Sequence, residues 1–599
     1  MIALAVACAG VLASAVVAVP TVRDAGHKAT TGASSPLPVT DSPSPSATAA
    51  PTHTATPTAG PTPTTGPPAG AGGSLNVLMV SDFDHLDPAR NYVSQALNFS
   101  RLLYRTLTTY KSVAGGSGLD LVPDLATNLG EPSNNGKTWT FHLKKGLKYE
   151  DGTTITSQDI KYNVERSFSD LLPEGPQYAR QFLVGGDSYP GPYKDGGQGL
   201  ASIVTPDATT IIFQLKSPHG DFNYTTALPT FSPVPKAMDT GVNYDKHVFS
   251  SGPYKIESYV AAKQMILVRN GFWSRETDTA RAALPDTVNV TFGLDPSIID
   301  QRILASTGPD SRAVQLDTSI QPENVAKVIG SSQYASRTVG GSTGFLRYIA
   351  INTSHKPFDN LKVRQAISYC TDKQAQQTAR GGHLVGGDIT QQILVPSVKG
   401  YQKYDPLGLD STPQGDPAKG KALLAQSGVK LPLNMTFQAN DTGKGVKQAT
   451  AFQAAMKRCG INVTVNNLPA TSYYSTVGQP NHEADALIAG WGPDWPSAST
   501  VIPPLFDSRQ IKPAGNQIFS MYQGADASAL DRQMDDPSSD PSLASATAKW
   551  TALDHAITDR ALFVPLLSDK AQYIWGNAVR HAYIHAFFGD LDMVALGVR

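Results

Sequence analysis

Charged side chains of either sign are scarce in this chain of 599 residues. Asp, Glu, Lys and Arg together make up only 17% of the sequence, and the formal net charge is -1. Lys and Arg are scattered singly among acids, so no basic stripe offers a surface to nucleic acid. The composition therefore excludes a mainly electrostatic contact with phosphates.

Sequence signatures of cofactor and metal sites are also missing. Neither a P-loop nor a dinucleotide fingerprint occurs, and His482-Glu483 lacks the second histidine of a H-E-x-x-H zinc site. CxxC spacing is absent, which argues against redox catalysis. We therefore expect no cofactor, no metal site and no catalytic residue.

One stretch does fit a catalytic motif. Residues 340–344 read Gly-Gly-Ser-Thr-Gly, the G-x-S-x-G pattern of a serine hydrolase, with Ser342 as the nucleophile. The motif requires a strand before the serine and a helix directly after it, whereas Phe345 to Ile351 reads as a strand. We expect a turn at a crossover between lobes instead, and keep a secreted serine hydrolase as the less favoured alternative.

Cysteine is nearly absent, with three residues in all. Cys370 and Cys459 are the two outside the N-terminal leader. An even pair in an oxidising compartment predicts a disulfide, but both positions also fit buried apolar helix faces. A disulfide and two buried thiols both stay open.

The N-terminus is apolar from Met1 to Pro20, and Arg23 is the first charged residue. Residues 1–23 therefore read as a signal peptide or an N-terminal membrane anchor, although a basic start is missing. Cys8 follows Ala5-Val6-Ala7, which suggests a lipidation site, but about ten apolar residues come after it where a lipoprotein turns polar. The choice between a lipidated, a cleaved and a retained leader stays open.

Residues 24–73 are dominated by Pro, Thr, Ser, Ala and Gly. Such a segment buries too little apolar surface to offset its ordering entropy, and its prolines keep it extended. We interpret it as a disordered linker that holds the folded part away from a surface.

The folded part begins near Ser74 and mixes strands with helices. Leu75 to Val80 reads as a strand, and Asn135-Gly136 marks a hairpin. Thr156 and Asp159 have the spacing of a capping box, and Asp416-Pro417 predicts another helix start. At this length one core does not suffice, so we expect at least two α/β lobes.

Several stretches resemble family-five extracellular solute-binding proteins, which include bacterial oligopeptide- and dipeptide-binding proteins. They are LVPDLATNLGEPSNNGKTWTFHLKKGLKYEDGTTITSQDIKYNVERS, SGPYKIESY, LVRNGFW, YIAINTSHKPFDNLKVRQAISYCTDK, DPAKGKALLAQSG and AGWGPDWP, in this order. The resemblance implies a two-lobed periplasmic-binding-protein-like fold of the large peptide-binding type, with the ligand cleft between the lobes. It places the N-terminal lobe at residues 74–341, completed by 572–599, and the second lobe at 342–571.

The resemblance also implies a binding site. In the loop Trp491-Gly492-Pro493-Asp494-Trp495, the carboxylate of Asp494 matches the group that receives the ammonium end of a bound peptide. A charge-assisted contact of this kind is strong in a dewatered cleft. The alternative is a loop Asp that bonds its own backbone in an Asx turn.

A second stretch, Tyr92-Val93-Ser94, matches the segment whose backbone lies along the peptide in oligopeptide-binding relatives. It could equally be a simple turn into the helix that begins near Ala96. Two positions depart from the oligopeptide pattern, because Ile488 replaces an arginine and Ala470 replaces an aromatic residue. These departures leave peptide length and carboxylate recognition open.

The resemblance implies a function in transport. We expect a monomeric, non-enzymatic protein on the outer face of the cell membrane, or secreted, that captures short peptides for the permease and ATPase subunits of an ABC importer. Related proteins bind other solutes, so an oligosaccharide or a nickel chelate remains an alternative ligand.

Overall fold

The structure, a computed structural model, describes residues 71–598. The predicted leader, Cys8 and nearly all of the predicted linker lie outside the described residues. Between residues 71 and 598, no helix combines the length and the hydropathy that crossing a membrane requires.

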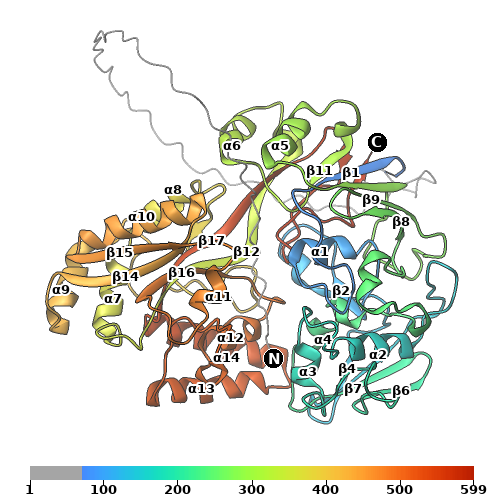
Figure 1. Cartoon of the computed structure of the whole chain (residues 1–599), viewed down its shortest axis with the longest axis horizontal. Coiled ribbons are helices and arrows are strands. Elements are labelled where there is room, and N and C mark those ends of the chain that lie inside the picture. The colour runs from blue at the N-terminus through green and yellow to red at the C-terminus, as the bar shows by residue number, and fades with distance from the viewer. Residues whose placement is uncertain (1–70, 599) are drawn as a thin grey trace, which may run out of the picture. The chain divides into compact units, whose positions relative to one another are not determined.

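Strands and helices are mixed along the chain, in runs of either kind (Figure 1). The strands are β1 Ser74–Leu78, β2 Thr108–Tyr110, β3 Leu121–Pro123, β4 Glu131–Ser133, β5 Thr138–His142, β6 Ile203–Asp207, β7 Thr210–Gln214, β8 Tyr254–Val260, β9 Gln264–Arg269, β10 Thr287–Thr291, β11 Ala313–Gln315, β12 Thr338–Ile351, β13 Asp388–Ile389, β14 Leu433–Asn440, β15 Ile461–Leu468, β16 Ala486–Trp491, β17 Phe563–Ile574, β18 Val579–Arg580 and β19 Gly597–Val598. The α-helices are α1 Ser94–Ser100, α2 Ser157–Arg166, α3 Tyr178–Phe182, α4 Phe222–Thr225, α5 Pro296–Ala305, α6 Pro322–Ile329, α7 Leu361–Cys370, α8 Lys373–Ala379, α9 Pro417–Ser427, α10 Gly443–Lys457, α11 Tyr473–Val477, α12 Ile502–Phe506, α13 Ala525–Ser538 and α14 Leu543–Asp559.

Three larger sheets organise these strands. Their orders are β11-β1-β10-β9-β8, β4-β5-β7-β6 and β13-β17-β12-β16-β14-β15. The first and the last of them combine parallel with antiparallel pairs. The mixture confirms the predicted α/β class.

The buried side chains fall into cores that divide the chain. One core gathers residues between Leu75 and Leu316 with residues between Ala571 and Val598, and we call this part the N-terminal region. Two further cores gather residues between Leu346 and Leu567, and we call this part the second region. The last residues of the chain therefore pack with its first strands.

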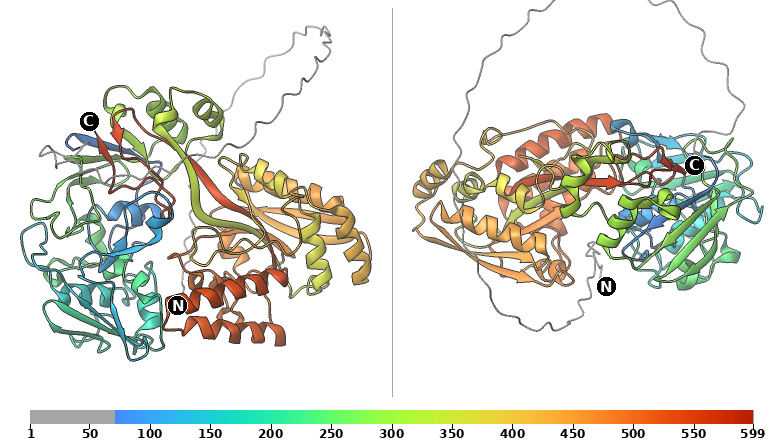
Figure 2. Two further views of the ribbon diagram at one scale, coloured as in Figure 1. Left: turned by 180° about the vertical axis from the view of Figure 1, so that it is seen from behind. Right: turned by 90° about the horizontal axis from the view of Figure 1, so that it is seen from above.

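The long strands β12 and β17 connect the two regions and lie side by side in every view (Figure 1, Figure 2). Ala571 and Tyr573 of β17 belong to the core of the N-terminal region, whereas Leu567 belongs to the second region. Their pairing register shifts between Ser342 and Leu346. The irregular pairing therefore occurs where the chain passes from one region to the other.

The predicted turn at residues 340–344 was wrong. Gly340 and Ser342 lie inside β12 and pair with Gln572 and Lys570 of β17. Glycines that read locally as a turn are held extended by this partner strand, and the strand continues where a hydrolase requires a helix. The hydroxyl of Ser342 accepts a hydrogen bond from the backbone N–H of Gly344, at 3.1 Å.

Local sequence signals did predict helix and hairpin ends. The backbone N–H of Thr156 donates to the carboxylate of Asp159 at 2.8 Å, and Asp416 accepts from the N–H of Lys419 at 2.9 Å. Asn135 and Gly136 both have positive φ, as the tight turn between β4 and β5 requires. These interactions join residues within four positions of one another, so they can be predicted from the sequence without knowing the tertiary packing.

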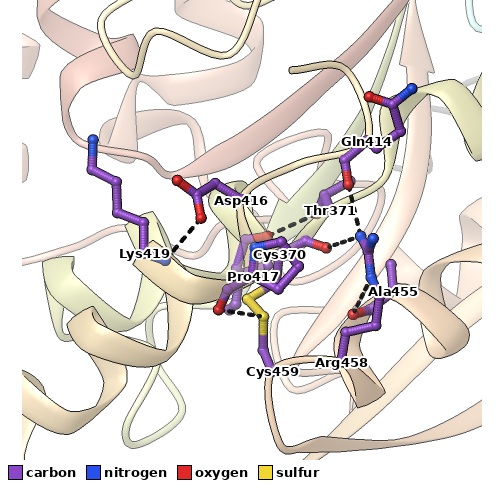
Figure 3. Close-up of a disulfide and its surroundings, with 10 residues drawn as sticks. Cys370, Thr371, Gln414, Asp416, Pro417, Lys419, Ala455, Arg458 and Cys459 are labelled. Carbon is purple, nitrogen blue, oxygen red and sulfur yellow. Dashed lines mark hydrogen bonds between the residues drawn. A yellow bond between two sulfur atoms is a disulfide. The ribbon is translucent and has the colours of Figure 1, made fainter.

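Cys370 and Cys459 are joined in a disulfide with a Cα–Cα distance of 6.2 Å (Figure 3). Both residues are buried, at the end of α7 and just after α10. Gly420 of α9 packs against the sulfur atoms, since a Cβ there would lie 2.4 Å from Cys370 Sγ. The bond thus ties the end of α7 to the segment after α10, with α9 packed against it.

Lys373 at the start of α8 is buried, and no carboxylate of residues 71–598 is in hydrogen-bond contact with it. Its Nζ donates to the carbonyl of Thr390 at 2.9 Å and to the side chain of Gln391. Burial lowers the pKa of Lys373 to about 7. The charged form is therefore disfavoured in the folded state relative to the unfolded chain.

This lysine predicts a specific pH dependence. Because its folded pKa lies below its unfolded value of 10.5, its destabilising effect is complete below pH 7 and is relieved as the pH rises. We expect the unfolding free energy of the wild type to rise by about 1.4 kcal/mol per pH unit between pH 7 and 9, relative to Lys373→Met. Urea titrations of both proteins measure the difference, and parallel pH profiles would contradict the assignment.

Candidate ligand-binding site

Asp494 lies in the loop that follows β16 and accepts hydrogen bonds from two tyrosines of the N-terminal region. The hydroxyl of Tyr92 donates to Oδ1 at 2.6 Å, and the hydroxyl of Tyr178 donates to Oδ2. The carboxylate therefore stands where residues of both regions meet. It is not held in an Asx turn, because these recorded side-chain contacts come from distant tyrosines.

Thr500 fixes the loop that carries Asp494. Its hydroxyl accepts the backbone N–H of Asp494 at 3.2 Å, and its carbonyl accepts the indole N–H of Trp491 at 2.8 Å. Trp491 is half-buried and packs against the second region. The ring of Phe345 packs directly on Gly492, because a Cβ on residue 492 would lie 2.7 Å from the ring.

Tyr92, Val93 and Ser94 form the entry to α1. Val93 is extended and caps the helix, and Ser94 is its first residue. Within residues 71–598, the backbone N–H and C=O of Tyr92 make no recorded hydrogen bond to protein. The free backbone N–H and C=O of Tyr92 are suited to pairing with a peptide backbone.

Water reaches Tyr92 although protein surrounds it. Its side chain is 39% exposed, yet burial raises the pKa of its hydroxyl well above the usual value. The same desolvation raises the pKa of Tyr178. Tyr92 is therefore partly exposed at the point where its hydroxyl meets Asp494.

Trp495 occupies a different position from its neighbours in the loop. It is only 2% exposed, its indole N–H donates to Asp221 at 2.9 Å, and its ring contacts Tyr178 at 4.7 Å between centroids. Ser499 donates to the same oxygen of Asp221 at 2.6 Å. Trp495 therefore joins the two regions and offers no open face for stacking on a ligand in this conformation.

Asp494 has no cationic partner in the described part of the chain. Desolvation raises the pKa of its carboxyl, and the hydrogen bonds from Tyr178 and Tyr92 oppose that effect. Neutral hydroxyls stabilise an ionised carboxylate less than a cation does. The site is therefore suited to receiving a positively charged group, whose arrival would offset the cost of burial.

Asp494 itself lines neither of two hollows found in the described residues, although Tyr110 in the wall of the first one is close enough to feel its charge. One is lined by residues that include Arg101, Tyr110 and Phe588, and the other by residues that include Ile329 and Leu384. Asp494 is half-buried, with the hydroxyls of Tyr92 and Tyr178 on its two oxygens. A ligand would have to displace the tyrosine hydroxyls or enter while the regions are further apart.

The sequence did not point to Tyr178 or Asp221. Tyr178 lies 316 residues from Asp494, and Asp221 lies 274 residues from Trp495, in short segments without a recognisable pattern.

Among the residues that the structure describes, no group of three or more His, Cys, Asp or Glu side chains is arranged to hold a metal ion.

Comparison with known proteins identifies relatives over most of the chain. Residues 120–513 match the family of bacterial extracellular solute-binding proteins, family 5 Middle. The probable D,D-dipeptide-binding periplasmic protein DdpA of Escherichia coli (strain K12) is 24% identical over 512 residues, covering 84% of this chain and 89% of that protein. The glutathione-binding protein GsiB of Escherichia coli O6:K15:H31 is 24% identical over 519 residues, covering 84% and 90%.

Solved structures share the fold. Clavulanic acid biosynthesis oligopeptide binding protein 2 superposes with a TM-score of 0.82 and 35% identity, over 88% of this chain and 96% of that one. The periplasmic murein tripeptide binding protein MppA, in an unliganded open form, superposes with a TM-score of 0.71 and 20% identity, over 89% and 99%. These matches confirm the two-lobed fold predicted from the sequence.

Proposed function

Because the chain belongs to family 5 of the bacterial extracellular solute-binding proteins, we propose that it captures short peptides outside the cytoplasm and passes them to an ABC importer. The observation that carries the proposal is Asp494, a desolvated carboxylate held by two tyrosine hydroxyls and lacking a cation among the described residues. The ammonium end of a peptide supplies that cation. The relatives are named as a probable D,D-dipeptide-binding protein, a glutathione-binding protein and an oligopeptide binding protein.

In this proposal the lobes follow the predicted boundaries, residues 74–341 with 572–599 and residues 342–571. The core of the N-terminal region and the long strands β12 and β17 support this division. Closure over a peptide would be a hinge motion favoured by contacts made only in the closed state. Asp494, Trp491 and Gly492 would bind from one lobe, and Tyr92, Val93 and Ser94 from the other.

The partners would be the permease and the ATPase subunits, which read the closed conformation of a monomeric binding protein. The leader would secrete the chain or tether it to the outer face of the membrane. An oligosaccharide or a nickel chelate as ligand has no support in the names of the relatives reported above. Trp495 also gives little support to a sugar, because it is buried between the regions.

Ser342 supplies a test against the hydrolase alternative. Its hydroxyl accepts a backbone N–H inside β12, and Lys570, its register partner in β17, is ion-paired with Asp388. We expect Ser342→Ala to leave peptide affinity unchanged and the wild type to be inert toward p-nitrophenyl acetate and short peptides. Turnover that disappears in the variant would establish a hydrolase and overturn the transport proposal.

A further inference from the structure

A hollow of about 340 Å³ lies beside the paired strands β12 and β17, where the chain passes between the two regions. Thr338, Gly340 and Gln572 line it from these strands. Ile329 lines it from the end of α6, and Leu384 from the loop between α8 and β13. The volume falls within the range of protein pockets that hold small molecules. The hollow is therefore large enough for a ligand of its own.

Two large apolar side chains remain exposed in this hollow. Ile329 is 42% exposed and Leu384 is 37% exposed. Val328, Ala335 and Val339 add further apolar surface to the lining. Single exposed apolar side chains are common on proteins, but two that line one hollow offer an apolar surface to the same ligand.

Lys570 of β17 is the one charged side chain among the described residues that line the hollow. Its Nζ lies 2.5 Å from Oδ1 of Asp388, whose side chain is 60% exposed and does not line the hollow. An anionic group in the hollow would meet this ammonium group, whereas a cationic group would meet no carboxylate among these lining residues. The charge of the hollow is thus complementary to an anion.

The hollow is separate from the site at Asp494, which does not line it. Lys570 directly follows Asp569 in β17, and successive side chains of a strand point to opposite faces. Asp569 accepts hydrogen bonds from Arg347 and Arg380, so these two arginines lie on the other face of β17 from Lys570. An occupant of the hollow is therefore a second solute, distinct from one bound at Asp494.

The two apolar side chains of the hollow belong to different regions. Val328 of α6 shares a buried core with Leu78 of β1, which places Ile329 with the N-terminal region. The loop that carries Leu384 begins and ends in the second region, because α8 is hydrogen-bonded to α10 and β13 pairs with β17. A rotation of one region against the other would therefore move Ile329 relative to Leu384.

The present arrangement holds this loop against α6. Val385, which follows Leu384, lies in the same buried core as Val328. In this arrangement Asp494 also meets the hydroxyls of Tyr92 and Tyr178. A ligand in contact with both walls of the hollow would add contacts that this arrangement offers, so its binding would favour the arrangement over one with the regions further apart.

We propose that the hollow is a second ligand-binding site for a small amphipathic carboxylate. The apolar body lies between Ile329 and Leu384, and the carboxylate meets Lys570. Occupancy favours the arrangement in which Asp494 meets the two tyrosines, and thereby raises the affinity for the solute bound at Asp494. The effect on peptide affinity rests on the proposed function, whereas the second site itself does not.

Calorimetric titration with two defined carboxylates tests the site. Naphthalene-1-acetate has an aromatic body and octanoate an aliphatic one, and the neutral amide of each is its control. We expect at least one of the two to bind the wild type with a dissociation constant below about 1 mM, and at least about threefold tighter than its amide. Absence of binding by both carboxylates, or equal binding of each carboxylate and its amide, would overturn the proposal.

Lys570→Gln assigns the preference for the carboxylate, because it removes the ammonium group. The carboxylate and its amide should bind this variant with about equal affinity. Lys216→Gln is the matched control, since Lys216 forms a surface ion pair with Asp187 at 2.7 Å and its side chain is 31% exposed. The control should keep the preference of the wild type. Thermal melts establish that each variant is folded, and a preference that persists in folded Lys570→Gln would contradict the proposal.

Two further variants change the apolar part of the hollow. Gly340→Val fills space beside Gln572, since a Cβ on residue 340 would lie 2.3 Å from Oε1 of Gln572. Leu384→Ser removes apolar surface from the wall. Each should weaken binding of the carboxylate about fivefold to tenfold. Leu361→Ser, at a residue of α7 that is 42% exposed, is the control and should bind like the wild type. If Gly340→Val does not fold, Leu384→Ser decides, and unchanged affinity in Leu384→Ser would overturn the site.

The coupling between the two sites is measured with Ala-Ala-Ala. Its affinity for the wild type should rise about fivefold or more when the bound carboxylate is saturating, and the carboxylate should gain the same factor from saturating peptide. Unchanged peptide affinity would overturn the coupling, and weaker peptide binding would place the carboxylate at Asp494 and contradict the proposal. If no peptide binds but the carboxylate binds with the expected dependence on Lys570 and Leu384, peptide capture fails and the second site stands.

Discussion

Asp494→Asn is expected to weaken the binding of Ala-Ala-Ala by about 2 to 5 kcal/mol while the protein stays folded. The substitution keeps the shape of the side chain and removes the negative charge, so the ammonium group of the ligand enters a desolvated site without a counterion. A solvent-exposed ion pair would contribute only about 0 to 1 kcal/mol. The size of the loss therefore tests whether the site closes around the ligand.

N-acetylation of the peptide removes the same interaction from the other side. Acetylation should greatly weaken peptide binding to the wild type and should weaken binding to Asp494→Asn only slightly, because the variant has already lost that interaction. The two changes form a double-mutant cycle with the ligand as partner. Isothermal titration of the four combinations gives the coupling free energy. The control is Asp187→Asn, whose side chain is 82% exposed and ion-paired at the surface, and it should bind normally. Additive losses would mean that Asp494 does not hold the ammonium group.

The largest expected effect on stability comes from the disulfide. Cys370 and Cys459 are 89 residues apart in the sequence, and a cross-link over a loop of this length restricts the unfolded chain strongly. Replacing both by alanine should lower the unfolding free energy by about 4 to 5 kcal/mol by the chain-entropy relation. Urea titrations of the oxidised wild type and the double variant provide the comparison.

Reductant is the control for this prediction. Reductant should lower the unfolding free energy of the wild type to about that of the double variant. It should not change the unfolding free energy of the double variant. Thiol counting under denaturing conditions should find neither Cys370 nor Cys459 free in exported, unreduced protein. Two titratable thiols there would instead support the account with two separate buried cysteines.

The parts of the fold that the sequence predicted depend on short-range chemistry. The capping interactions of Thr156 and Asp416 and the hairpin at Asn135-Gly136 involve residues within a few positions of one another. The two-lobed arrangement was predicted from the family resemblance, because several stretches of family-like sequence occur in the expected order. The loop Trp491 to Trp495 was singled out in this way, from the resemblance and not from its local pattern.

What the sequence did not reveal depends on contacts between distant segments. Tyr178 and Asp221 reach the loop of Asp494 only after the N-terminal region and the second region have come together. The glycines at 340 and 341 read as a turn because their pairing partner in β17 lies more than 200 residues later. Arg347 and Asp569 meet for the same reason.

Native mass spectrometry of the protein, purified from its exported form without refolding, tests the central claim most directly. The account predicts adducts whose masses and fragments identify short peptides with a free amino end, exchangeable for added Ala-Ala-Ala and lost in Asp494→Asn. An adduct without an amino group would contradict it. So would a protein that carries no adduct and gains none when incubated with an equimolar mixture of peptides of two to five residues.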